Sequence, residues 1–303
     1  MASEELRAVA EMMRGQEGIA AEGLSMQERR EGMEAMQAAL PMPDDIETTA
    51  VDIGGIPGRW VVAPGARDDA FVIYYHGGGY VMGSLDTHQE LMGRISRVCQ
   101  AKVLGVDYRL APEHVYPAAV EDGVSSYEWL LAQGADASRV MLAGDSAGGG
   151  LTMATLLSIR DKGGILPVGA MMFSPWTDLT ASGESATSRA DADPMVTLPA
   201  LLEMAEIYYA SADASDPLVS PVFADLGGLP PLLIQVGDAE LLLDDASRLA
   251  DNAKSAGVMA LYQVWDEAFH VFQAIPNLPE AADALQKVGK FYLDSVKLEQ
   301  KVS

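Results

Sequence analysis

The sequence predicts an α/β fold with a mostly parallel central sheet and helices on both of its faces. Short, nearly continuous apolar runs alternate along most of the chain with stretches of helical pattern. Strands buried on both faces lose the alternation of polar and apolar residues, so such runs between helices are typical of a parallel sheet. Because α/β folds of about 250 residues often form one domain, the 303 residues indicate one main domain with an accessory segment.

The strands and helices of the main domain are predicted in alternation. The apolar runs predicted as strands are Phe71–Tyr75, Ala101–Val106, Val140–Ala143, Val168–Phe173, Leu232–Val236 and Val258–Val264. Helical patterns separate most of them, including Tyr116–Ala132, Leu151–Lys162 and Asp244–Ala256. This order is the one expected of β-α-β units.

Two regions depart from that alternation. From Ser3 to Leu40 apolar residues recur at helical spacing, with breaks at glycines, and Pro41 ends the pattern. Two β-like runs, Glu47–Ile53 and Gly58–Val62, then suit a hairpin at the edge of a sheet. Between residues 174 and 230 no strand is predicted, only a helix over Leu198–Tyr209 flanked by loops. We interpret this interval as an insertion over one end of the sheet.

Composition restricts the classes of partner. The chain is 49% apolar and 21% charged, as globular proteins are, and it carries 44 acidic against 20 basic residues, a net charge of −24. Phosphate backbones require the opposite sign, so we expect neither nucleic acid nor an anionic membrane as a partner. Cys99 is the single cysteine, which excludes an intrachain disulfide and favours the cytoplasm.

Gly144-Asp145-Ser146-Ala147-Gly148 is the strongest chemical signal in the sequence. It follows the predicted strand Val140–Ala143 and precedes an apolar helix, which is the strand-turn-helix setting of the Gly-x-Ser-x-Gly nucleophile motif. The sharp turn lifts the serine hydroxyl off the sheet, and side chains at the two glycines would collide with the neighbouring strand and helix. The motif therefore predicts Ser146 as a nucleophile.

A nucleophilic serine needs a base and an acid that follow it in the chain. His270 is the one histidine after Ser146, and it follows the last predicted strand. The strand Leu232–Val236 should deliver the acid from its carboxyl end, where Asp238 and Glu240 come first. Asp244 and Asp245, the remaining candidates, fall in the next helix, whose dipole explains acids in its first turn. Asp238 is nearer the strand and Glu240 has the longer side chain, so the residues alone leave both open.

Three consecutive glycines follow the strand Phe71–Tyr75 in His76-Gly77-Gly78-Gly79. A glycine loop after a strand leaves backbone N–H groups exposed for a developing oxyanion, and the N–H after the nucleophile, that of Ala147, completes such a site. The charged neighbours Arg109 and Glu113 are interpreted as an ion pair or hydrogen-bond cluster that stabilises this loop.

Together these motifs resemble the hormone-sensitive-lipase-like (bacterial type IV) esterases of the α/β-hydrolase superfamily. The resemblance runs from about Trp60 to the C-terminus and includes Tyr108-Arg109-Leu110-Ala111-Pro112-Glu113, Ser174-Pro175-Trp176, Asp216-Pro217-Leu218 and Ser220-Pro221. It implies an α/β-hydrolase fold with Ser146 as nucleophile, His270 as base, and Gly78, Gly79 and Ala147 as oxyanion donors. The family usually has Asp-Pro-Leu at the acid, whereas Glu240-Leu241-Leu242 resembles a subgroup that uses glutamate. The resemblance therefore favours Glu240.

The resemblance also implies a cap over the site. Residues 1–45 would form its N-terminal helical segment, and residues 46–303 the catalytic domain with the cap insertion at about 175–230. Bulky residues on the two segments predict a short, closed acyl pocket: Met13, Met33, Met36, Met204 and Tyr208.

The function predicted is hydrolysis of short-chain carboxylic esters through an acyl-enzyme on Ser146. No P-loop, dinucleotide fingerprint or metal-ligand cluster occurs in the sequence, so no cofactor and no metal are expected. The motifs report acyl transfer and not the leaving group, which leaves a lactonase, an amidase or a deacetylase as alternatives. A ligand-binding relative without activity is the rival from another class, and the sequence leaves a homodimer open.

Overall fold

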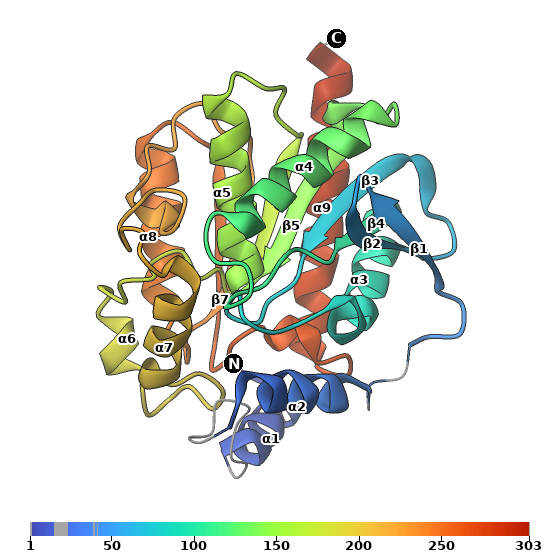
Figure 1. The fold of residues 1–303 in the computed structure, drawn as a ribbon. Coiled ribbons are helices and arrows are strands. Elements are labelled where there is room, and N and C mark those ends of the chain that lie inside the picture. The colour runs from blue at the N-terminus through green and yellow to red at the C-terminus, as the bar shows by residue number, and fades with distance from the viewer. Residues whose placement is uncertain (1, 15–23, 39, 41, 303) are drawn as a thin grey trace.

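A single eight-stranded sheet forms the centre of the computed structural model, which describes residues 2–14, 24–38, 40 and 42–302 (Figure 1). The strand order is β1-β2-β4-β3-β5-β6-β7-β8. The pairs β1–β2 and β2–β4 are antiparallel, and every other pair is parallel. The mostly parallel α/β fold predicted from the sequence is confirmed. The strands are β1 (Glu47–Ile53), β2 (Ile56–Val62), β3 (Arg67–Tyr75), β4 (Ala101–Val106), β5 (Val140–Asp145), β6 (Gly169–Phe173), β7 (Leu232–Gly237) and β8 (Ala260–Trp265).

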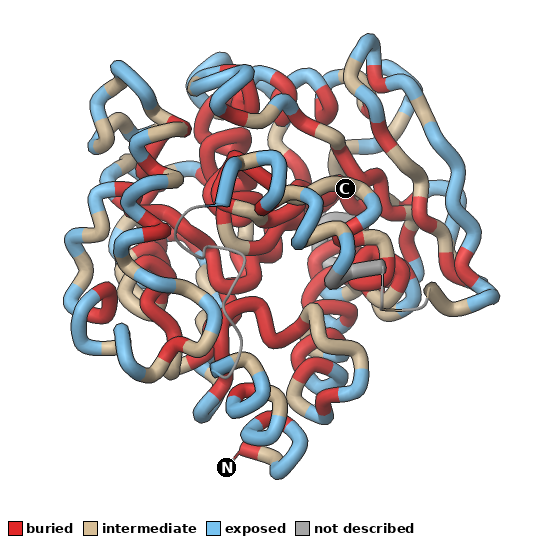
Figure 2. The backbone as a smooth tube through the Cα atoms, turned by 60° about the horizontal axis from the view of Figure 1, so that its bottom comes forward, coloured by how far each residue is buried: buried red, intermediate tan, exposed pale blue. Residues whose placement is uncertain are grey.

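Helices cover both faces of this sheet, and the strands supply apolar side chains to each. In β3, Ile73 and Tyr75 enter one core with α4, α5 and α8, while Val72 and Tyr74 enter the other core with α3 and α9. This alternation is the two-residue period of a strand, and Figure 2 shows the resulting buried centre beneath exposed outer turns. The helices are α1 (Glu4–Arg14), α2 (Met26–Ala38), α3 (Leu85–Cys99), α4 (Ala118–Ala132), α5 (Ala147–Asp161), α6 (Ser185–Ser188), α7 (Leu198–Tyr209), α8 (Leu243–Ser255) and α9 (Pro279–Val302), with 3-10 turns at Ala137–Arg139, Pro221–Phe223 and Phe272–Ala274.

The helix α5 begins at Ala147, directly after Ser146 as the elbow motif predicts and four residues before the helical pattern at Leu151–Lys162. Its first turns contain Gly148, Gly149 and Gly150. Glycines carry no apolar periodicity, so the sequence pattern hides this part of the helix. Close packing explains them: a Cβ at Gly148 would overlap the carbonyl oxygen of Tyr75, and a Cβ at Gly149 would lie 2.7 Å from that of Pro175.

The N-terminal helices and the insertion lie at the same end of the molecule (Figure 1). Between β6 and β7 the chain forms α6, α7 and a 3-10 turn without a strand, and α7 has the predicted bounds. An ion pair joins Arg29 of α2 to Glu203 of α7, with 2.8 Å between Nη1 and Oε2. Another contact joins Arg14 of α1 to the carbonyl oxygen of Ala192 at 3.2 Å.

Candidate active site

Ser146 occupies a sharp turn between β5 and α5. Its backbone has φ 52° and ψ −122°, a conformation that L-residues rarely adopt, and its N–H donates to the carbonyl oxygen of Phe173 at 2.9 Å. The flanking glycines are required by space, because a Cβ at Gly144 would overlap the carbonyl oxygen of Gly148. Ser146 is half-buried. The turn has the strand-turn-helix geometry of a nucleophile elbow.

His270 and Glu240 meet beside the carboxyl ends of β7 and β8. The imidazole Nδ1 lies 3.0 Å from Glu240 Oε2, and both residues are buried. The other carboxylate oxygen, Oε1, accepts from the hydroxyl of Ser174 at 2.7 Å and from the N–H of Gly237 at 2.6 Å. Both carboxylate oxygens are therefore engaged, and one of them faces the imidazole.

The charge of Glu240 changes the proton affinity of His270. Burial lowers the pKa of the imidazole, yet the hydrogen bond and the charge of Glu240, followed by the charges of Asp193 and Asp145, raise it above its ordinary value. Burial raises the pKa of Glu240 itself, so its ionised form depends on the hydrogen bonds that surround it. The charge of Glu240 therefore stabilises the imidazolium when His270 accepts a proton.

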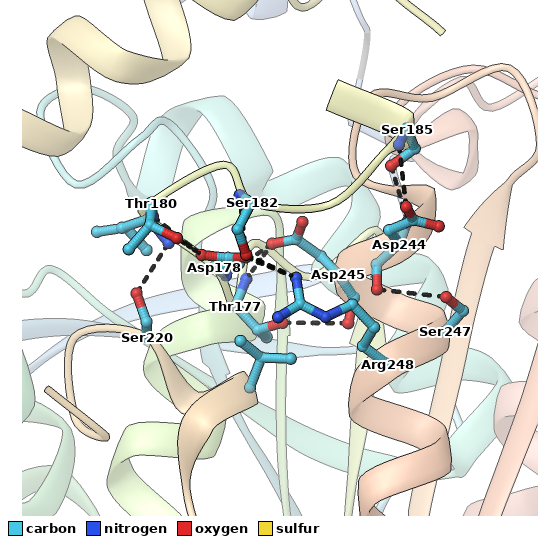
Figure 3. A network of polar contacts seen from close by, with 12 residues as sticks. Thr177, Asp178, Thr180, Ser182, Ser185, Ser220, Asp244, Asp245, Ser247 and Arg248 are labelled. Carbon is cyan, nitrogen blue, oxygen red and sulfur yellow. Dashed lines mark hydrogen bonds and ion pairs between the residues drawn. The ribbon is translucent and has the colours of Figure 1, made fainter. Parts of the chain in front are cut away.

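The other candidate acids contact different groups. Asp238 Oδ1 accepts from the N–H of Glu267 at 2.7 Å, in the loop before His270. Asp244 accepts from the N–H of Ser185 at 2.9 Å. Asp245 Oδ2 accepts from the N–H groups of Thr177 and Asp178, each at 2.7 Å. Figure 3 shows how Asp244 and Asp245 hold the start of the insertion against α8. Of the four acids predicted from the strand end, Glu240 is the one that meets His270.

Ser174 was missed by the sequence argument for the acid–base pair. Besides donating to Glu240, its Oγ accepts from the N–H of Val271 at 3.0 Å, so one hydroxyl links the acid to the residue after His270. Ser174 is fully buried and has φ 46°. Its place directly after β6, at the same sheet edge, was the available signal.

The glycine loop follows β3 and lies against the elbow. Gly78 and Gly79 have φ of 116° and 64°, and their N–H groups donate to no other atom within the described part of the chain. Gly77 donates to Asp145 Oδ1 at 3.1 Å, which ties the loop to the residue before Ser146. Ala147 is the first residue of α5, where N–H groups have no partner inside the helix. The predicted oxyanion donors are thus free backbone N–H groups next to Ser146.

Buried polar side chains support the same loop from below. Asp145 also accepts from the hydroxyl of Tyr74 at 2.6 Å, and its Oδ2 lies 3.4 Å from His88 Nε2. The hydroxyl of Tyr108 donates to the carbonyl oxygen of His76 at 2.7 Å, and the two rings stack with centroids 4.3 Å apart. Burial, followed by the charge of His88, lowers the pKa of His76 to about 3. His76 therefore remains neutral and acts as packing.

Arg109 and Glu113 do not pair with each other, contrary to one interpretation of their motif. Arg109 binds Asp122, with 2.8 Å between Nη2 and Oδ1, and Glu121 at 3.0 Å. Glu113 pairs with Arg30 of α2 at 2.7 Å. Each of the two residues thus pairs with an acid or base outside the Tyr108–Glu113 motif.

The two N-terminal helices hold different sides of the site. On α1, fully buried Leu6 belongs to one apolar cluster with Phe269 and Phe272, which flank His270. On α2, Arg30 donates to the carbonyl oxygen of Val81, just after the glycine loop, at 2.8 Å, and to that of Ala111, in the loop after β4, at 3.0 Å. Met36 was also expected at the pocket, but its side chain lies outside the described residues.

The insertion reaches the glycine loop through α7. A Cβ at Gly79 would overlap the sulfur of Met204, so α7 rests directly on an expected oxyanion donor. Tyr208 of α7 stacks on Tyr80, with ring centroids 3.7 Å apart. The described His, Cys, Asp and Glu side chains form no group of three or more that could hold a metal ion.

A comparison of the sequence with known families decides the classification. A family profile described as alpha/beta hydrolase fold matches residues 72–274. The chain belongs to this family. The match runs from within β3 to beyond β8 and contains the glycine loop, the elbow and both members of the acid–base pair.

Named relatives of this alpha/beta hydrolase are ester-cleaving enzymes. An acetyl-hydrolase of Streptomyces hygroscopicus is 43% identical over 250 residues, which are 82% of each chain. An esterase of Acinetobacter venetianus is 34% identical over 254 residues, which are 83% of this chain and 84% of the relative.

Solved structures agree with the sequence relatives. An esterase from the bacterial hormone-sensitive lipase family is 46% identical, with a TM-score of 0.93 and coverage of 98% of this chain and 99% of the other. An esterase/lipase from an uncultured bacterium is 44% identical, with a TM-score of 0.94 and coverage of 98% and 100%. The predicted resemblance to the hormone-sensitive-lipase-like esterases is confirmed.

Proposed function

We propose that this alpha/beta hydrolase cleaves short-chain carboxylic esters through an acyl-enzyme on Ser146. The proposal is carried by one observation, the buried His270–Glu240 pair with 3.0 Å between Nδ1 and Oε2, at the sheet edge where the Ser146 turn and the free glycine N–H groups also lie. A base oriented by a carboxylate, a serine on a strained turn and free N–H donors are the components of acyl transfer.

Each group has one role in the reaction. Ser146 Oγ attacks the ester carbonyl while His270 takes its proton, and the N–H groups of Gly78, Gly79 and Ala147 stabilise the oxyanion. The C–O bond to the alcohol breaks as His270 returns the proton to the leaving oxygen. Water then attacks the acyl-enzyme as His270 takes a proton from it. The bond between the acyl carbon and Ser146 Oγ breaks as His270 returns that proton to Oγ, and the carboxylic acid leaves. Glu240 fixes the imidazole tautomer and stabilises its cation. No cofactor takes part in this scheme.

Short acyl groups fit the bulky walls around the glycine loop. Met204 and Tyr208 pack on Gly79 and Tyr80, directly beside the proposed oxyanion donors. We propose that α1, α2 and the insertion form the cap, since all three contact the loops of the site. Each buried methylene contributes about 0.8 kcal/mol until the pocket is full, so acetyl to about hexanoyl esters should be preferred. The acetyl-hydrolase among the relatives supports the lower end of this range.

A series of p-nitrophenyl esters from acetyl to palmitoyl tests the proposal. Wild type should cleave the short esters, and Ser146→Ala should lose on the order of 10⁶-fold in kcat, as nucleophile removal does in serine hydrolases. Ser188→Ala, on the exposed end of α6, controls for the loss of a hydroxyl. Retained turnover in Ser146→Ala contradicts the nucleophile, and a kcat/KM that rises up to palmitoyl contradicts the short pocket.

We also propose a homodimer that pairs through β8, the last strand of the sheet order. Leu261 and Val264 on this strand are 43% and 47% exposed, and an edge strand with exposed apolar residues and unpaired N–H and C=O groups can pair with the same strand of a second copy. Light scattering after size exclusion should give twice the chain mass, and Val264→Lys should give the monomer mass. A monomeric wild type contradicts the proposal.

The cytoplasm is the compartment that we propose for this enzyme, because its one cysteine, Cys99, is buried and unpaired. Among the helices that the structure describes, none combines the length and apolar character needed to cross a membrane.

A further inference from the structure

Asp193 is a buried carboxylate that the insertion contributes next to the acid–base pair. It lies in the loop between α6 and α7 and is 9% exposed. Its Oδ2 accepts from the N–H of Leu241 at 3.1 Å, and Leu241 directly follows Glu240. Its Oδ1 accepts from the N–H groups of Met195 and Val196, at 2.9 and 3.0 Å. Both oxygens act as acceptors, as in the ionised form.

No cation within the described part of the chain forms a salt bridge with Asp193. A buried carboxylate without a counter-ion is costly, because hydrogen bonds replace only part of its hydration. Its charge is felt by the neighbouring pair: after the larger effects of burial and of their own hydrogen bond, Asp193 raises the pKa of both His270 and Glu240. The group that gains from this charge is the imidazolium.

We propose that Asp193 is a positioning residue that stabilises the protonated form of His270, so that the insertion completes the acid–base half of the site. The inference rests on the proposed function and adds to it a residue that touches neither substrate nor the reacting atoms. Its carboxylate holds the turn after Glu240 through Leu241 and supplies a second negative charge when His270 carries the proton of Ser146. The position of the insertion against the turn after Glu240 then affects how strongly His270 holds a proton.

Three carboxylates act on the imidazole from different elements. Glu240 follows β7 and binds it directly, Asp193 belongs to the insertion, and Asp145 ends β5. Asp145 already has the hydroxyl of Tyr74 and the imidazole of His88 as partners. Asp193 has only N–H partners, so its charge is the less compensated of the two more distant ones.

Ser185 provides a matched comparison. Like Asp193, Ser185 belongs to the insertion and binds the turn after Glu240. Its Oγ donates to the carbonyl oxygen of Leu241 at 2.6 Å and accepts from the N–H of Asp244 at 2.9 Å. It carries no charge. Asp213, an exposed acid of the insertion that accepts from Ser215 at 2.9 Å, controls for the loss of one turn carboxylate elsewhere.

The test is the pH dependence of kcat/KM on p-nitrophenyl butyrate for wild type and the Asp193→Asn, Ser185→Ala and Asp213→Asn variants. Removing a negative charge near His270 lowers the pKa of the imidazole, so the acid limb of Asp193→Asn should move to lower pH. Its kcat should fall on the order of 10-fold, because the imidazolium that forms as Ser146 attacks loses a stabilising charge, with little change in KM. Ser185→Ala should lower kcat without moving the limb, and Asp213→Asn should behave as wild type.

A second measurement does not depend on turnover. NMR titration of ring-labelled histidine in the Ser146→Ala background, with His270→Asn for assignment, should show His270 titrating at lower pH when Asp193→Asn is added. Asp193→Ser, whose hydroxyl keeps an acceptor for the Met195 N–H, should give the same shift if Asp193→Asn does not fold. An unmoved His270 titration in both variants, or an equal shift in Ser185→Ala, overturns the inference. Turnover that survives Ser146→Ala contradicts the proposed function instead and leaves this titration interpretable.

Discussion

The two halves of the site are built from different kinds of group. The proposed oxyanion donors are peptide N–H groups, two of them in the glycine loop, whereas the acid–base pair consists of two side chains, Glu240 and His270, from separate loops. The glycine loop is set by space, because Gly78 and Gly79 lie where a Cβ would overlap Met82 or Met204. The acid–base pair is set by individual hydrogen bonds, from Ser174 and Gly237 to Glu240 and from Leu241 to Asp193 of the insertion. Substitutions that add volume to the glycine loop should therefore lower activity through the oxyanion donors. Substitutions that remove a charge or a hydroxyl should lower it through the acid–base pair.

The largest effect is expected on the acid–base side. Glu240→Gln keeps the size of the acid but removes the charge that fixes the tautomer of His270, so kcat should fall about 10⁴-fold with little change in KM. Asp238→Asn is the matched control, because Asp238 binds the N–H of Glu267 and not the imidazole. Steady-state kinetics on p-nitrophenyl acetate measures both. The opposite ranking of the two variants would make Asp238 the acid.

On the oxyanion side Gly79→Ala should lower kcat by about 10²–10³-fold, the usual cost of one lost oxyanion donor. The new Cβ meets the sulfur of Met204 at a residue with φ 64°, so the loop must move. Gly134→Ala carries the same kind of backbone strain, with φ 93°, but in open space. It should lower the melting temperature and leave kcat near that of wild type. Equal losses of kcat in both variants would attribute the effect to general destabilisation.

The two N-terminal helices differ in the same way, because α1 packs against the His270 loop and α2 packs beside the glycine loop. Leu6→Ala on α1 empties space against Phe269 and Phe272 and should cost about 2–5 kcal/mol of stability, together with a loss of kcat through the His270 loop. Met33→Ala on α2, which packs near Val81 and Met82, should change the acyl-length preference more than kcat. Urea unfolding and the ester series separate these outcomes. A changed acyl preference in Leu6→Ala would contradict the division between the helices.

The smallest effect concerns the anchor of the insertion on α8. Burial, the largest cause, raises the pKa of Asp245 to about 8, far above that of the unfolded chain. Folding therefore favours its neutral form, and the stability that this gives is full below the unfolded pKa and is lost as pH rises through about 8. The oxygen of Asn can accept the same two N–H bonds without titrating. Asp245→Asn should thus gain melting temperature over wild type progressively from pH 5 to pH 8.

The control for this series is Asp225→Asn, on an exposed turn. It tests whether the loss of one negative charge from a strongly acidic chain accounts for the gain. A melting-temperature difference for Asp245→Asn that is constant with pH would contradict the assigned burial effect.

The sheet and the chemical motifs could be predicted from the sequence because they depend on local residue patterns. The apolar runs that became β4 and β7 had nearly the observed bounds, since strands buried on both faces need continuous apolar residues. Gly144 and Gly148 around Ser146 are demanded by close backbone contacts, so the motif and its geometry imply each other. The glycine loop could be predicted for the same reason, since its glycines also lie in close contact with neighbouring atoms.

Only the tertiary structure decided which distant side chains meet. Asp238 and Glu240 are equivalent as local sequence, and the difference between them arises because the loop after β8 brings His270 to Glu240 and the N–H of Glu267 to Asp238. Ser174 and Asp193 carry no motif of their own for this purpose, since a hydroxyl or a carboxylate gains its role from what the fold places within hydrogen-bond distance. The sequence by itself determined the backbone scaffold and the nucleophile turn, because those are fixed by volume and periodicity. The partners of the acid–base pair come from four separate segments, the loops after β6, β7 and β8 and the insertion. No local sequence pattern determines how these segments lie relative to one another.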